Sequence, residues 1–251
     1  MKRYKLTIQY DGTNYRGWQK QKNGISVQEV LTDALKKIAV GEVKVTGSGR
    51  TDSGVHAKGQ VAHVDMSTSV PSNKIAQAVN VHLPSDVAVT YSEEVDFDFH
   101  ARYGAKAKTY RYRTYVSQTT LPLLDRYALR LERMPDVQKM QECAKIFLGE
   151  HDFRGFMASG SSVKDTVRTI YDIWVKSDED EIVFSVTGNG FLYNMVRIMV
   201  GTLLDVGYSR RSIDEVRQAI EGGDRSHLGK TVSSRGLTLH SVVYTDKKEK
   251  L

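Results

Sequence analysis

The residues of this chain best suited to chemistry lie in a glycine-rich turn, Gly47–His56. Its one carboxylate is Asp52, and Arg50 stands two positions before it. A nearby guanidinium favours the ionised form of a carboxyl group, and glycines allow positive φ and close approach of a ligand to the backbone. The turn also has an ordinary interpretation, because Asp and Ser among glycines commonly hydrogen-bond to their own backbone. We take Asp52 as the candidate catalytic group.

Basic and aromatic residues alternate in a second segment, Lys108–Tyr115. Strand geometry places Tyr110 and Tyr112 on one face and Arg111 and Arg113 on the other. This pattern is typical of a half-buried strand with a basic solvent face. It also suits single-stranded RNA, in which a tyrosine stacks on a base and arginines contact phosphates.

One cation interrupts the apolar segment Phe191–Val206, which predicts a buried helix. Arg197 lies within this segment. Its long side chain can reach solvent while its stem stays buried. If the helix lies beside a cleft, the same guanidinium is available to a carboxylate or a phosphate.

The composition favours a globular protein with a polyanionic partner. The chain has 251 residues, 40% of them hydrophobic, and a formal net charge of +6. This length allows one large domain or two of ordinary size. The excess of positive charge is compatible with nucleic acid. Cys143 is the single cysteine, which excludes an internal disulfide and favours a reducing cytoplasm.

Several other classes of site are excluded by the sequence. Asp224 stands where a phosphate-binding P-loop ending at Thr231 needs glycine, and Tyr193 stands where a dinucleotide fingerprint needs it. The histidines have no spacing typical of zinc ligands. No segment is apolar enough to span a bilayer, and the N-terminus has no signal pattern. We therefore expect no metal, no nucleotide cofactor and no membrane association.

Capping signals, apolar stripes and alternation together predict an α+β protein. The expected helices are 26–38, 72–81, 136–148, 191–206 and 212–221; the expected strands are 4–10, 43–45, 60–65, 109–116, 170–176, 181–187 and 237–244. We place a boundary near residue 100, between an N-terminal domain, 1–100, and a C-terminal domain, 101–251. A charged tail, Asp246–Leu251, is expected to be solvated.

Motifs along nearly the whole chain resemble the TruA family of tRNA pseudouridine synthases. The most specific is the run Gly49–Val61, which contains Asp52. The others, in chain order, are Tyr10–Gly12, Gly17–Gln19, Ser26–Glu29, Asn80–Pro84, Phe99–Arg102, Lys108–Tyr112 and Gly190–Arg197. One departure is the absence of the prolines that often precede the Gly236-Leu237 pair, which affects the expected shape of that loop.

The resemblance implies a fold of two ferredoxin-like, RRM-like α/β halves. They are expected to join through a mostly antiparallel sheet, with helices on one side and a central cleft. It also implies a cytoplasmic homodimer that needs no cofactor and converts uridine to pseudouridine in the anticodon stem-loop of tRNA, at positions 38, 39 and 40.

The resemblance also assigns roles to individual residues. Asp52 is the nucleophile, Arg50 helps to displace the target base, Tyr110 stacks on the flipped uracil, and Arg197 meets Asp52 from the other domain. The residues expected to contact RNA are Lys20, Lys22, His56, Arg102, Lys106, Lys108 and Leu237.

The order of bond-making steps stays open at this stage. Asp52 can attack C1′ or stabilise an oxocarbenium-like centre, as in glycosidases, and a glycal intermediate or addition to the base are other routes. Two rival functions also stay open. A non-catalytic RNA-binding module explains the basic aromatic strand but not Arg50 and Asp52 in a glycine turn. A ribonucleoside hydrolase would release free uracil.

Overall fold

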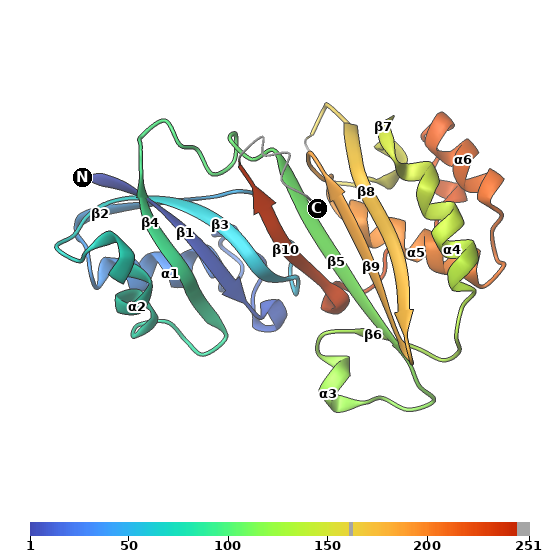
Figure 1. Ribbon diagram of the computed structural model, residues 1–251, viewed down its shortest axis with the longest axis horizontal. Coiled ribbons are helices and arrows are strands. Elements are labelled where there is room, and N and C mark those ends of the chain that lie inside the picture. The colour runs from blue at the N-terminus through green and yellow to red at the C-terminus, as the bar shows by residue number, and fades with distance from the viewer. Residues whose placement is uncertain (161–162, 245–251) are drawn as a thin grey trace. The chain divides into compact units, whose positions relative to one another are not determined.

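A computed structural model describes residues 1–160 and 163–244. The expected solvated tail, Asp246–Leu251, lies outside the described residues. The chain forms two compact units. The first contains Met1–Lys106 together with the segment from Thr238, and the second contains Ala107–Leu237 (Figure 1).

The first unit is a sheet with two helices on one face. Its elements are β1 (Lys2–Tyr10), α1 (Val27–Lys36), β2 (Val40–Gly47), β3 (His56–Ser67), α2 (Ile75–Asn80), β4 (Val87–Val95) and β10 (Leu237–Val243). Antiparallel pairing joins β4 to β1, β1 to β3 and β3 to β2. The last strand, β10, pairs with β3 in parallel, with Thr238 opposite His56.

Alternation along β1 shows why the helices cover one face of this sheet. Tyr4, Leu6, Ile8 and Tyr10 are each at most 3% exposed, and they form the apolar side of the strand. Helix α1 packs against β2, α2 packs against β4, and the two helices contact each other. The Ser26 side chain caps α1 by accepting a hydrogen bond from the Glu29 N–H.

The second unit is also a mostly antiparallel sheet with helices. Its elements are β5 (Ala107–Val116), α3 (Pro122–Asp125), β6 (Leu129–Leu131), α4 (Val137–Ala144), β7 (Gly149–Asp152), β8 (Val167–Asp178), β9 (Glu181–Gly188), α5 (Met195–Gly207) and α6 (Ile213–Gly222). The strand order is β5-β9-β8-β7, and β6 lies parallel to β5. Helix α4 packs against α5 and β8, and α5 contacts β5.

Short 3-10 helices connect several of these elements. They are η1 (Gly12–Asn14), η2 (Ser72–Lys74), η3 (Lys145–Phe147), η4 (Arg154–Phe156), η5 (Arg225–His227) and η6 (Ser234–Gly236).

The expected α+β class with mostly antiparallel strands is confirmed, whereas some element boundaries were wrong. Helix α5 begins at Met195, because Asn194 has a left-handed φ of 61° and ends the irregular segment before it. The helices expected over 72–81 and 136–148 are shorter, since each is partly 3-10. The expected elements also lacked the strands β4, β6 and β7 and the short helix α3. Ferredoxin-like halves and a central cleft stay predictions. In the described part of the chain, no helix is long and apolar enough to cross a membrane.

Candidate functional site

Asp52 lies in the loop between β2 and β3, as the glycine-rich sequence predicts. The Val55 N–H donates to the Asp52 carbonyl oxygen at 3.1 Å, which closes a tight turn. Gly54 has a φ of +76° within this turn, a conformation that a side chain would disfavour. The Asp52 side chain is half-buried, whereas Arg50 is exposed.

An N-terminal segment holds the residues on both sides of Asp52. Thr51 receives two contacts: its hydroxyl hydrogen-bonds the Tyr10 hydroxyl at 2.8 Å, and its carbonyl accepts from the Trp18 N–H at 3.1 Å. The Gly54 N–H donates to the Tyr15 carbonyl at 3.2 Å. The catalytic candidate is therefore held by partners from β1 and the loop that follows it.

Two glycines allow this close approach. Gly17 has a φ of +86°, and a Cβ built there would overlap the Thr51 carbonyl and lie 3.1 Å from the Asp52 carbonyl carbon. A Cβ at Gly12 would overlap the Val55 carbonyl. Backbone therefore packs directly on backbone at the Asp52 loop, so a methyl group at either glycine must displace it.

The start of the loop is fixed by a buried polar pair. The Ser48 hydroxyl donates to Gln60 Oε1 at 2.6 Å, and Gln60 Nε2 donates to the Gly49 carbonyl at 3.0 Å. Ser48 and Gln60 are both fully buried. Breaking this pair would leave polar groups without partners in the protein interior, which is costly.

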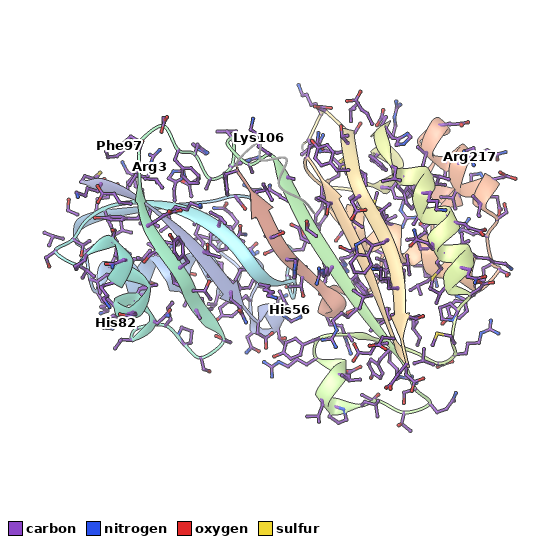
Figure 2. All side chains as sticks on the ribbon, viewed as in Figure 1. Arg3, His56, His82, Phe97, Lys106 and Arg217 are labelled. Carbon is purple, nitrogen blue, oxygen red and sulfur yellow. The ribbon has the colours of Figure 1, made fainter. Side chains whose placement is uncertain are left out.

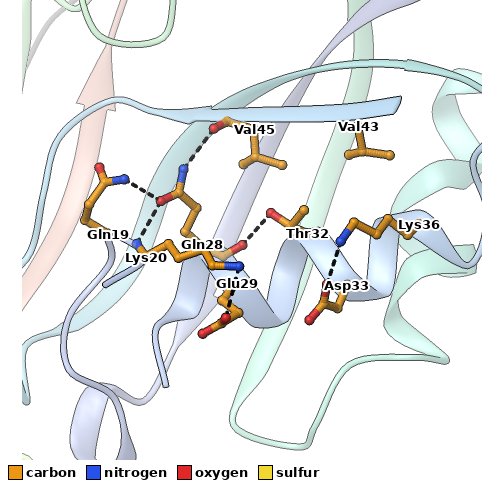
Figure 3. A pocket seen from close by; sticks show the side chains of 9 residues that line it. All are labelled: Gln19, Lys20, Gln28, Glu29, Thr32, Asp33, Lys36, Val43 and Val45. Atoms are coloured by element: carbon orange, nitrogen blue, oxygen red, sulfur yellow. Dashed lines mark hydrogen bonds and ion pairs between the residues drawn. The ribbon is translucent and has the colours of Figure 1, made fainter. Parts of the chain in front are cut away.

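Gln28 braces the Gly17–Lys20 segment on α1 and β2 (Figure 3). Its Oε1 accepts from Gln19 Nε2 at 2.8 Å and from the Lys20 backbone N–H at 2.9 Å, while its Nε2 donates to the Val45 carbonyl at 2.9 Å. These residues line a pocket of about 310 Å³. In the same pocket, the Lys20 ammonium pairs with the Glu29 carboxylate at 3.2 Å. The contacts of Gln28 and Glu29 therefore hold the Gly17–Lys20 segment against α1.

His56 begins β3 and is only 4% exposed (Figure 2). Its Nδ1 accepts a hydrogen bond from the Gly12 N–H at 3.0 Å and lies 3.1 Å from the Asp11 carboxylate. The ring thus links the C-terminal end of the Asp52 loop to the turn after β1.

Tyr110 and Arg197 belong to the second unit. Tyr110 lies on β5 opposite Val186 and is 9% exposed. Its ring meets the Phe191 ring edge to face, with 5.1 Å between centroids. The Phe191 ring therefore helps to fix the orientation of the Tyr110 ring.

Arg197 lies in the first turn of α5, and its guanidinium is oriented by two hydrogen bonds. Its Nε donates to the Val232 carbonyl at 2.7 Å, and its Nη1 donates to Asn194 Oδ1 at 2.6 Å. Gly201 allows the neighbouring segment to approach the helix, because a Cβ there would overlap the Lys230 carbonyl. The charge of Arg197 also acts on Tyr112. Burial raises the pKa of the Tyr112 phenol, and Arg197 opposes this rise.

The expected RNA contacts differ in exposure. Arg102 is exposed, with its guanidinium 5.8 Å from the Tyr103 ring centroid. Lys20, Lys22 and Lys106 are exposed, Lys108 is half-buried, and His56 and Leu237 are buried.

The sequence analysis did not single out Tyr10, Thr51 or Gln28 as supports of the site. All three lie in motifs named above, namely Tyr10–Gly12, Gly49–Val61 and Ser26–Glu29, and these motifs were the available signal. Among residues 1–160 and 163–244, no group of three or more His, Cys, Asp or Glu side chains is placed to hold a metal ion.

Comparisons with known proteins agree on one family. The model of a family described as tRNA pseudouridine synthase matches residues 6–104 and 143–245. The tRNA pseudouridine synthase A of Acetivibrio thermocellus is 46% identical over 97% of this chain and 100% of its own length. The corresponding protein of Ruminiclostridium cellulolyticum is also 46% identical over 97% of this chain. The tRNA pseudouridine synthase A 2 of Clostridium perfringens is 44% identical over the same share.

A likeness to solved structures is much weaker. A chain in the crystal structure of a Cbf5-Nop10-Gar1 complex matches with a TM-score of 0.36 and 15% identity, covering 93% of this chain and 60% of that one.

Proposed function

The chain belongs to the tRNA pseudouridine synthase family, and from this premise we propose that Asp52 is the nucleophile of its reaction. The protein is an isomerase that converts uridine in tRNA to pseudouridine. The observation that supports Asp52 in this role is the immobilisation of its loop. The hydrogen bonds to Thr51 and the backbone contact at Gly17 fix the residue before Asp52.

The proposed reaction needs only one ionised carboxylate to begin. The Asp52 carboxylate attacks C1′ of the ribose, and the bond from C1′ to N1 breaks. The uracil turns while it is held, and C5 bonds to C1′ as the carboxylate leaves. C5 finally loses its proton to a base, and N1 takes up a proton. The reaction consumes no water, because the product is an isomer of the substrate. A glycosidase, in contrast, delivers water to C1′ with a second carboxylate.

The neighbouring residues take supporting roles in the proposal. Arg50 is exposed beside Asp52, where it can displace the target base from its stack. Tyr110 stacks on the extruded uracil and relays the proton lost from C5 by passing on its own hydroxyl proton. Arg197 supplies positive charge to the same uridine and to the Asp52 carboxylate. Cations expected on the RNA backbone offset the cost of unstacking, which is a few kcal/mol.

We propose the anticodon stem-loop, at positions 38, 39 and 40, as the target, and a cytoplasmic homodimer as the working form. The support for these points is the motif resemblance over nearly the whole chain. We also propose that the first unit is a ferredoxin-like half carrying the Asp52 loop. Its element order is βαββαβ, and its antiparallel strands lie in the order β4-β1-β3-β2. The second unit then completes the RNA-binding surface.

The test of the proposed nucleophile is Asp52→Asn, which removes the charge and hardly changes the shape. We expect the release of tritium from tRNA labelled at C5 of uridine to fall below detection, while the dissociation constant for tRNA changes less than threefold. Normal tritium release by this variant would refute the proposed role.

Product analysis separates the isomerase from a hydrolase. Wild-type protein should convert each consumed uridine to pseudouridine. Free uracil in stoichiometric amount would contradict the assignment of isomerase chemistry.

A further inference from the structure

A second pocket, of about 540 Å³, lies in the second unit and contains none of the residues assigned to the reaction. The pocket is lined by the segment after β5, by β6 and the segment that follows it, and by the segment after α5. Its lining residues are Gln118, Arg130, Leu131, Glu132, Arg133, Tyr208 and Arg210.

Tyr208 supports two guanidiniums in this pocket. The Cζ atoms of Arg133 and Arg210 lie 5.1 and 4.9 Å from the centre of its ring. The Tyr208 hydroxyl donates to the Arg133 carbonyl at 2.8 Å, which fixes the ring beside the backbone of that residue. A guanidinium stacked on an aromatic ring keeps its N–H groups directed outward along its edge, where a phosphate can accept two of them.

The pocket has more positive than negative charge. Within the described residues, no hydrogen bond or ion pair engages the Arg133 guanidinium. Arg210 has one long contact, at 3.4 Å, with Asp205. Arg130 is placed by the carbonyls of the segment beside it, and Glu132, its acidic neighbour, has a side chain that is 81% exposed and 3.7 Å away. Glu132 therefore neutralises little of the charge of the three arginines.

The segment after α5 that carries Tyr208 and Arg210 is held against the rest of the unit. The Asp136 N–H donates to the Gly207 carbonyl at 2.9 Å, and a Cβ at Gly207 would lie 2.8 Å from Met140. The Arg210 N–H donates to the Asp205 carbonyl at 2.8 Å. The guanidiniums are thus presented by a fixed backbone, which lowers the entropy lost when they bind a ligand.

We propose that this pocket binds the sugar–phosphate backbone of tRNA through Arg133 and Arg210, as a contact additional to those near Asp52. The inference rests on the proposed function, because it takes tRNA as the polyanion. Leu131 is the one aliphatic residue of the lining, and the other groups are charged or carry hydrogen-bonding atoms. Such a lining suits phosphates, which every tRNA shares, and favours binding that does not depend on base sequence.

The test compares two charge-matched double variants. Arg133→Gln/Arg210→Gln removes two positive charges from the pocket. Lys145→Gln/Arg217→Gln removes two from exposed positions elsewhere in the same unit; Arg217 lies on α6 (Figure 2). The measurements are the dissociation constant of the complete protein for unmodified tRNA at several salt concentrations, and kcat at saturating tRNA.

We expect the pocket variant to bind tRNA about tenfold more weakly, and its salt dependence to decrease by about one unit of slope for each phosphate that it no longer neutralises. The control should keep the wild-type slope within about half a unit, and kcat of both variants should equal that of wild type. Arg133→Lys/Arg210→Lys keeps both charges and should recover the slope, while its affinity stays a few-fold weaker because an ammonium lacks the arginine fork.

Equal affinity and slope in the pocket variant and the control would overturn the proposal. A changed oligomeric state by sedimentation, with unchanged tRNA affinity, would also overturn it and assign the pocket to a protein partner. Failure of the proposed function looks different: wild-type protein would make no pseudouridine, whatever the two variants do to binding.

Discussion

Gly17 provides the sharpest test of how the Asp52 loop is held, because a second glycine, Gly41, matches its backbone angle but lacks its close contact with the loop. Gly17 and Gly41 have nearly the same backbone angle, with φ of +86° and +81°. A Cβ at Gly17 would overlap the Thr51 carbonyl, whereas nothing lies within 4 Å of a Cβ at Gly41. Alanine at Gly41 therefore adds backbone strain alone, and alanine at Gly17 adds strain and displaces the residue before Asp52.

The expected magnitudes follow from these two terms. Left-handed backbone strain costs about 1 kcal/mol for alanine in either variant, which lowers the Tm by about 3 °C in a protein of this size. Forcing a methyl group against packed backbone adds about 1–3 kcal/mol for Gly17→Ala. A displacement of about 1 Å at a reacting group reduces turnover about 100-fold. We expect this loss in kcat for Gly17→Ala and less than a twofold change for Gly41→Ala.

The assay measures pseudouridine formation at saturating tRNA, at a temperature where both variants stay folded. Thermal unfolding of each variant, recorded in parallel, sets that temperature. Gly17→Ala with the same kcat as Gly41→Ala would refute the argument that backbone contact at this glycine positions Asp52.

Three further predictions test other parts of the structure. Tyr10→Phe removes the 2.8 Å hydrogen bond to Thr51, and it should lower the free energy of unfolding by about 1 kcal/mol and kcat several-fold. The control is Tyr4→Phe on the same strand, and equal kcat in the two variants would contradict the role of Tyr10. Tyr110→Phe should keep tRNA affinity and slow a late proton transfer, so wild-type turnover in rapid-quench experiments would reduce Tyr110 to packing. Burial, together with Arg3 and His100, lowers the pKa of His63 to about 4. As the pH falls below 6.5, the unfolded chain therefore binds a proton at His63, and the native state does so only near pH 4. Stability should fall between pH 6.5 and pH 4 by at most about 3 kcal/mol, and urea unfolding of His63→Asn should show a smaller fall; an unchanged fall would assign it to other groups.

Several features of this protein could be read from neighbouring residues. The Asp52 turn, the capped start of α1 and the alternation along β5 are local patterns, each spanning a few residues. The structure has the first two, and it has the alternation from Tyr110 to Thr114, after which Tyr115 is also buried. The motif resemblance reaches the family, because its residues occur in order along nearly the whole chain.

Other elements were not predicted correctly from their local sequence, because a backbone conformation or a tertiary contact overrides the local pattern. Burial along β4 does not alternate regularly, since its pairing with β1 shifts register between Thr7 and Ile8. The apolar residues after Gly190 suggest a continuous helix, yet the left-handed conformation of Asn194 delays α5 to Met195.

The sequence by itself determined which residue carries the candidate charge, because Asp52 and its glycines are adjacent. Only the tertiary structure decided what holds that charge in place and where the second basic pocket lies. The Tyr10–Thr51 hydrogen bond joins residues 41 positions apart, and the Tyr208–Arg133 bond joins residues 75 apart. Contacts at such separations depend on how elements pack, and no local periodicity in the chain encodes them.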